Sequence, residues 1–110
     1  MKEEQLQYCI NVCWSCRDTS QKALYNHYIK LGEKNVDAAH VKIMTDCIQI
    51  CQNAADFLTR YSRFDDQICA LCALICDACA ISCDRFETEE MQRCAEMCRK
   101  CATYCRGENI

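Results

Sequence analysis

The sequence has no proline and only two glycines, Gly32 and Gly107, in 110 residues. All-β folds and doubly wound α/β folds need many tight turns, and turns depend on these two residue types. Their scarcity argues against such folds and favours long helices joined by a few short loops. The net charge is -3 and no basic stripe is present, so we expect no nucleic-acid partner.

Long hydrophobic runs and an export signal are also missing. The longest uninterrupted apolar run, 68–76, has nine residues, whereas a membrane-spanning helix needs about 20. Glu3 and Glu4 lie where a secretory signal would carry cationic residues. We therefore expect a soluble cytoplasmic protein with no membrane contact, forming a single domain over residues 1–110.

Cysteine is abundant, at 14 of the 110 residues, and its spacing is regular. Two series advance in steps of three and four: Cys69, Cys72, Cys76, Cys79 and Cys83, then Cys94, Cys98, Cys101 and Cys105. Such steps place side chains on one face of an α-helix, where Leu or Ile form the seam of a helical bundle. The spacing therefore predicts helices whose inward seam is made of sulfur.

Turn and capping residues divide the chain into four helical segments. The first covers Glu3–Leu31 and stops at Gly32, a typical helix-ending residue. Asp37 caps a second segment to residue 61, Asp65 or Asp66 a third to residue 85, and Thr88 a fourth to residue 106. Short connections make successive helices antiparallel, so we predict an all-α, up-down-up-down four-helix bundle with a cysteine-lined core.

The first two segments carry the same seam with fewer cysteines. The first places Leu6, Cys9, Cys13, Cys16, Ser20, Ala23 and His27 on one face. The second places His40, Met44, Cys47, Cys51, Ala54, Leu58 and Tyr61 there, and Met91 precedes the cysteines of the fourth. All fourteen cysteines lie on these four faces, which indicates a metal-binding core.

Thiolates and thioethers bind Cu(I), zinc and iron–sulfur centres. The net charge of the buried metal site distinguishes the first two. A four-thiolate zinc site has two excess negative charges. The seams carry no Lys or Arg to offset them, and burying one uncompensated charge costs several kcal/mol. One Cu(I) per thiolate is neutral, and the thioethers of Met44 and Met91 suit it. The loop-borne cysteine run of an iron–sulfur protein is missing. We therefore predict multiple Cu(I) ions.

Two other classes stay open. One is a thiol redox protein or sensor that uses the CxxC pairs, although a reactive cysteine needs nearby cationic groups, which the seams lack. The other is a zinc-binding or purely structural bundle. A disulfide scaffold is disfavoured, because such scaffolds are rich in loops and because unexported cysteine-rich chains more often bind metals or react as thiols.

Antiparallel helices bring His40, Met44, His27 and Met91 to one end of the bundle. We predict Met44 and His40 as neutral metal ligands there, and His27 and Met91 as lining a mouth for ion uptake. Leu6, Leu58 and Tyr61 lie at the opposite end, where we expect them to close the core.

The third segment is apolar on nearly all sides. Asp77 is its only charge between Asp66 and Asp84, and its outer positions include Ala70, Ala73, Leu74, Ala80 and Ile81. A helix of this kind is usually buried on more than one side. We therefore expect this segment to contact a second copy of the chain.

The CxxCxxxCxxCxxxC run of the third segment and the CxxxCxxCxxxC run of the fourth resemble the cytosolic copper storage proteins. The resemblance covers essentially the whole chain. It implies a non-enzymatic Cu(I) store that assembles as a homotetramer. It also implies that the ligands are Cys9, Cys13, Cys16, Cys47, Cys51, Cys69, Cys72, Cys76, Cys79, Cys83, Cys94, Cys98, Cys101 and Cys105. Ser20, Ala23, Ala54 and Leu58 stand at seam positions without a thiol, so we expect a reduced capacity.

Overall fold

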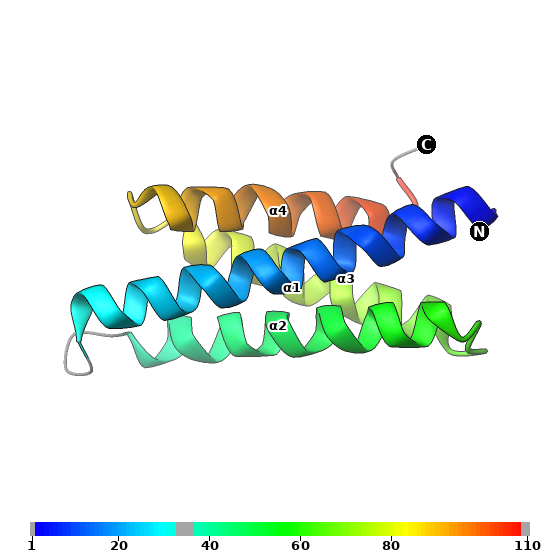
Figure 1. Cartoon of the computed structure of the whole chain (residues 1–110), viewed down its shortest axis with the longest axis horizontal. Helices are drawn as coiled ribbons and strands as arrows, with labels where there is room; N and C mark the ends of the chain where they lie inside the picture. Colours follow the sequence, from blue (N-terminus) through cyan, green and yellow to red (C-terminus); the bar gives the residue numbers. More distant parts are fainter. Residues whose placement is uncertain (1, 33–36, 109–110) are drawn as a thin grey trace.

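The computed structural model describes residues 2–32 and 37–108, and these ranges contain four α-helices and no strand. The helices are α1 (Glu3–Leu31), α2 (Ala38–Thr59), α3 (Asp65–Cys83) and α4 (Glu89–Cys105). Consecutive helices run in opposite directions along one long axis (Figure 1). The predicted all-α, up-down-up-down bundle is confirmed.

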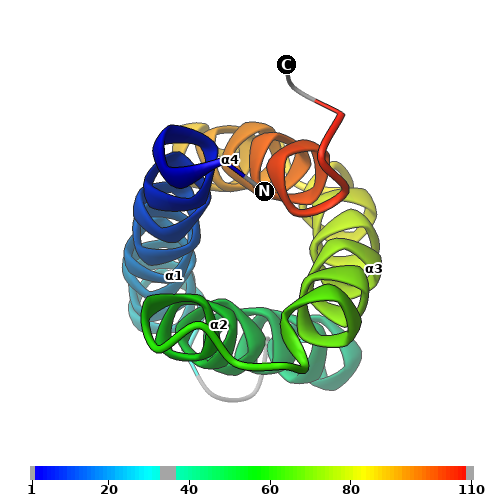
Figure 2. The same cartoon turned by 90° about the vertical axis from the view of Figure 1, so that its right-hand side faces the viewer.

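Each helix packs against two neighbours around a shared axis. α1 and α3 both contact α2 and α4, so the four helices form a ring when viewed end-on (Figure 2). The bundle measures 45 × 21 × 17 Å along its principal axes. The faces that point to the axis carry the seams, so the core is a narrow column running the length of the molecule.

The predicted caps hold at three of the helix ends. α1 ends at Gly32, whose φ of 74° lies in the left-handed region that glycine adopts without strain. Asp37 begins α2, because its carboxylate accepts hydrogen bonds from the amides of Ala39 and His40. The Thr88 hydroxyl accepts from the Met91 amide at the start of α4. These caps satisfy helix-end groups that would otherwise lack partners.

The start of α3 differs from the prediction that Asp65 or Asp66 caps it. The capping position is Phe64, whose carbonyl accepts the first helical hydrogen bond from the Ile68 amide. The preceding turn passes through Tyr61, which has a φ of 56°, and this turn starts the helix one residue earlier. Asp65 and Asp66 therefore lie inside the first turn, where they stabilise the helix dipole.

The apolar surface of α3 is smaller than the sequence suggested. Ala73 and Ala80 pack into the bundle, whereas Leu71, Leu74 and Ile81 are 46%, 67% and 69% exposed. By length and composition α3 could cross a membrane, with a mean hydropathy of 1.6. Its cysteine face is buried against the other helices. Core helices of soluble proteins have the same composition, so this is weak evidence for a membrane span.

Candidate metal centre

The structure places every cysteine in the core as a free thiol. Only three of the fourteen side chains are reached by solvent at all, and the other eleven are 0% exposed. Among the described residues the buried polar side chains are Ser20, His27 and His40. The centre of the bundle is therefore a column of sulfur atoms with no lysine or arginine buried beside it.

Thirteen of the cysteines fall into five groups whose sulfur atoms lie within 4.8 Å of one another. From the end where α1 begins, the groups are Cys9–Cys69–Cys105, Cys13–Cys72–Cys101–Cys105, Cys16–Cys51–Cys76–Cys101, Cys16–Cys47–Cys98 and Cys79–Cys94–Cys98. Each group shares one cysteine with the next. Cys83 is the cysteine outside these groups, and it neighbours Cys79 and Cys94. The five groups thus form one continuous chain of potential sites.

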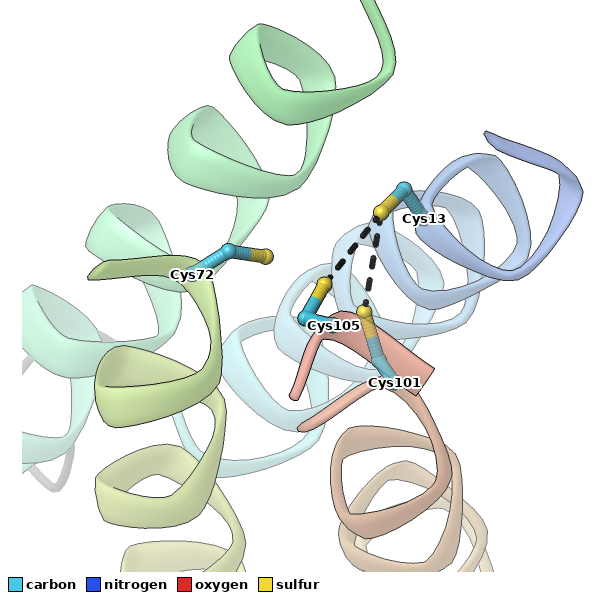
Figure 3. Close-up of side chains that lie close together, drawn as sticks. All are labelled: Cys13, Cys72, Cys101 and Cys105. Atoms are coloured by element: carbon cyan, nitrogen blue, oxygen red, sulfur yellow. Dashed lines mark hydrogen bonds between the residues drawn. The ribbon is translucent and has the colours of Figure 1, made fainter. Parts of the chain in front are cut away.

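The spacing of sulfur atoms within the groups suits a shared soft metal ion. In the group of Figure 3, the Sγ atom of Cys13 lies 3.8 Å from that of Cys105 and 3.9 Å from that of Cys101. The shortest contact of the column, between Cys51 and Cys76, is 3.6 Å. Because these sulfurs come from facing helices, the four-helix packing itself brings the ligands together.

Hydrogen bonds among the thiols raise the pKa of some and lower that of others: a bond with Cys16 lowers the pKa of Cys47, and a bond with Cys101 lowers that of Cys72. Burial acts in one direction only and favours the protonated form of each. A hydrogen bond with Cys16, followed by bonds with other thiols and burial, raises the pKa of Cys98. A bond with Cys105, a bond with Cys9 and burial raise the pKa of Cys69 in the same way. A cation that binds at such thiols must therefore displace protons, and a +1 ion that replaces one proton leaves the core neutral.

Ser20 places the only hydroxyl among the buried sulfurs of the described chain. Its Oγ atom lies 3.4 Å from Cys94 Sγ and 3.9 Å from the Sγ atoms of Cys47 and Cys98. A hydroxyl is a poor ligand for soft metals. Ser20 therefore occupies a ligand position between two thiol groups without supplying a ligand.

The structure buries the four residues predicted at the mouth and brings the two histidines together. His40, Met44 and Met91 are 0% exposed and His27 is 6% exposed. The two imidazole rings lie 5.4 Å apart, and their buried Nε2 atoms have no hydrogen-bond partner among the residues that the structure describes. Burial lowers the pKa of both, that of His40 to about 4, so the rings are neutral at pH 7. Neutral imidazoles with free nitrogens are suitable metal ligands.

Phe86, which sequence reasoning missed, covers these two histidines. Its ring lies 4.7 Å from that of His27 and 4.4 Å from that of His40. The Arg85 guanidinium lies 5.3 Å from the Phe86 ring and forms an ion pair with Asp37. Phe86 belongs to the connection after α3, where no helical periodicity exists to reveal an inward side chain.

At the opposite end Leu6 and Leu58 are buried, as expected of residues that close the core, whereas Tyr61 is not. These residues line a cavity of about 670 Å³ that reaches Cys69 and Cys105. Tyr61 lies at its rim, 66% exposed, because its turn directs the hydroxyl to a hydrogen bond with Glu3. The aromatic ring that should have covered the thiols is therefore held at the surface.

The sequence profile of the family described as copper storage protein matches residues 2–109. The chain belongs to this family. A curated relative, the uncharacterized cysteine-rich protein YhjQ of Bacillus subtilis, is 33% identical over 107 residues, which cover 94% of this chain and 95% of the relative.

Solved structures of similar proteins share the fold of this chain. The Nmul_A1745 protein of Nitrosospira multiformis has a TM-score of 0.87 and 39% identity, covering 97% of this chain and 96% of its own. The Cu(I)-bound copper storage protein BsCsp3 has a TM-score of 0.87 and 27% identity, covering 96% and 99%. Apo-Csp3 from Bacillus subtilis has a TM-score of 0.84 and 29% identity, covering 94% and 98%.

Proposed function

We propose that this chain is a non-enzymatic store that sequesters multiple Cu(I) ions in the cytoplasm. Its family is that of the copper storage proteins, and a structurally similar relative has been solved with Cu(I) bound. Residues 1–110 act as one copper-binding domain. The ligands are the fourteen cysteines, with the thioether of Met44 and the imidazole of His40 at one end of the column.

The observation that carries this proposal is the chain of five thiol groups that share members. Five divalent ions in these groups would leave three of the thirteen thiolate charges uncompensated in a buried core. Monovalent Cu(I) can match the thiolates one to one, and it accepts two or three ligands. Shared cysteines then bridge neighbouring ions, so the column holds a neutral metal–sulfur assembly.

The end of the bundle that carries His27, His40, Met44 and Met91, here called the His/Met end, supplies neutral imidazole and thioether ligands. The Nε2 atoms of His27 and His40 have no partner within residues 2–32 and 37–108, which is costly in a buried site, and a bound ion would satisfy them. We assign His27 and Met91 to the same end as weaker, neutral ligands. Ions can pass through this predicted mouth only if Phe86 moves, because its ring contacts both histidines.

The exposed side of α3 supports self-association. Leu71, Leu74 and Ile81 lie within about three turns of α3, and their exposed fractions are 46%, 67% and 69%. We propose that this face contacts another copy of the chain in a homotetramer, as the family resemblance implies.

The rival functions have less support from the geometry. A redox sensor needs an accessible, activated thiolate, whereas the CxxC pairs of this chain are buried and carry no buried cation. A zinc-binding bundle is compatible with the four-thiol groups but not with the excess charge of the whole column.

Anaerobic titration of the reduced chain with Cu(I) against a competing chelator tests the proposal. We expect roughly one ion per cysteine, since one thiolate neutralises one Cu(I). Binding of only one or two ions would contradict storage, and tighter binding of zinc than of Cu(I) would favour the alternative metal.

A further inference from the structure

Among residues 2–32 and 37–108, the cysteines that solvent touches lie at one end of the thiol column. The cysteines with any exposed surface are Cys9, Cys69 and Cys105, at 1%, 4% and 7%. At the other end of the column Cys83 and Cys94 are 0% exposed. The 670 Å³ cavity that reaches Cys69 and Cys105 lies between the start of α1, the start of α3 and the end of α4.

These three buried cysteines with a small solvent-accessible surface are also a ligand group of their own. Their sulfur atoms lie within 4.8 Å of one another, and the Sγ atoms of Cys9 and Cys105 are 3.9 Å apart. Cys105 belongs to the next group as well, 3.8 Å from Cys13. An ion bound to Cys9, Cys69 and Cys105 can therefore exchange one thiolate at a time and move inward without leaving sulfur.

The charges around the cavity attract a cation. Glu3, Asp65 and Asp66 line it, and Arg106 is the single basic residue of the lining. The Arg106 charge is already offset, because its guanidinium forms ion pairs with Asp77 and Glu108. The Oδ1 atom of Asp65 is buried and has no hydrogen-bond partner within residues 2–32 and 37–108. The cavity is thus negatively charged and leads directly to thiols.

We propose that Cys9, Cys69 and Cys105 form the port through which Cu(I) enters and leaves the column, with Glu3, Asp65 and Asp66 guiding the ion to it. This inference rests on the proposed storage function and names the route of the ion. At the port, one thiol releases its proton to solvent for each Cu(I) that binds, so the copper stays monovalent throughout. The His/Met end is then the far end of the column, closed by Phe86.

Two matched double variants test the port. Cys69→Ser/Cys105→Ser removes two terminal thiols at the cavity, and Cys83→Ser/Cys94→Ser removes two terminal thiols from the same helices at the other end. Both should lose the same small part of the Cu(I) capacity. In stopped flow with the Cu(I)–acetonitrile complex, followed by near-ultraviolet thiolate–copper absorbance, we expect the first variant to take up copper several-fold more slowly than the second.

A second pair tests the guiding charges. Asp66→Asn and Asp46→Asn remove the same charge, but Asp46 is an exposed residue of α2 away from the cavity lining. Added salt screens steering of an ion by exposed charges. We expect slower uptake and a weaker dependence on salt in Asp66→Asn than in Asp46→Asn.

Brief alkylation of the unmodified, reduced chain gives a readout that needs neither copper nor a variant. Peptide mapping should find Cys69 and Cys105 modified before Cys83 and Cys94. The reverse order, or slower uptake in Cys83→Ser/Cys94→Ser, would overturn the port and leave storage intact if the capacity stays high. A capacity of one or two ions in the wild type would overturn storage, and the port with it.

Discussion

A single side-chain atom decides whether a seam position can hold metal. The Ser20 hydroxyl contacts the sulfurs of Cys94, Cys47 and Cys98 but contributes oxygen where the soft ion needs sulfur. At the end of the column, His40 is held by a hydrogen bond of 2.7 Å between its Nδ1 atom and the Ser82 hydroxyl. Nε2, the other ring nitrogen, is buried in the core and has no partner in the described part of the chain. The residue at a buried position therefore sets the number of Cu(I) ions that the column can hold, as at Ser20, or the dependence of stability on pH, as at His40.

Ser20→Cys should raise the capacity for Cu(I) by about one ion, because it supplies a thiolate to sulfurs already in contact. The measurement is anaerobic titration of the variant against a chelator. Ser20→Ala is the control, which removes the hydroxyl without adding a ligand and should keep the wild-type capacity. Equal capacities of the cysteine and alanine variants would contradict the role assigned to this position.

The stability of the copper-free chain should fall as the pH drops from about 6.5 to about 4. Burial, His27 and Arg85 lower the folded pKa of His40 to about 4, whereas the unfolded pKa is about 6.5. The unfolded state binds the extra proton in this window, so acid favours unfolding. The loss should be on the order of 2 to 3 kcal/mol.

Denaturant unfolding over this pH range measures the effect. His40→Asn keeps a side chain that can bond Ser82 but has no titrating ring, so its stability should vary less with pH. An identical pH profile in the variant would show that another group is responsible.

The cysteine spacing determines which face of each helix is turned to the core. Steps of three and four residues keep each seam facing the axis over the whole length of α3 and α4, and the structure buries all nine of their cysteines. The same spacing leaves Leu74 and Ile81 of α3 on the opposite side, 67% and 69% exposed. One helix therefore supplies ligands on one face and an apolar surface on the other.

Leu74→Glu combined with Ile81→Glu should dissociate the proposed oligomer, because burying each of these side chains contributes about 1.5 to 3 kcal/mol. Light scattering after size exclusion measures the mass. The control is Ile29→Glu, which changes an equally exposed isoleucine on α1, 76% exposed. A wild-type chain that is monomeric, or a double variant that keeps the oligomer, would contradict the contact.

In the molecule as a whole, binding of Cu(I) is coupled to the release of thiol protons. Burial and mutual hydrogen bonding raise the pKa of Cys51, Cys69 and Cys98, in each case first through a bond with a neighbouring thiol. These thiols hold their protons at neutral pH, and binding of Cu(I) must release them. At such thiols, copper uptake exchanges one monovalent cation for another.

Loading should therefore release about one proton per Cu(I), and the affinity per ion should fall about tenfold for each unit of decrease in pH. Proton release in weakly buffered solution and chelator competition at several pH values measure the two effects. Copper uptake without proton release would mean that the core thiols are already ionised.

Much of this protein follows from its sequence. We predicted four antiparallel helices from the absence of proline and the few glycines. The steps of three and four residues predicted the inward sulfur seam, because spacing along a helix determines which side chains share a face. Gly32, Asp37 and Thr88 also predicted their caps, because capping depends on neighbours in the chain. The predicted start of α3 was wrong, because a turn at Tyr61 with a positive φ replaced the expected aspartate cap.

Only the tertiary structure decided which thiols share a site and which end of the column is reached by a surface cavity. The five groups combine cysteines from facing helices, and their register depends on how the helices slide against one another. Phe86 and Tyr61 lie in the connections beyond the helices, where periodicity gives no direction to a side chain. Packing turned Phe86 inward over the histidines and left Tyr61 at the rim of the cavity. The seam is thus a property of sequence, and the way into it is a property of the folded chain.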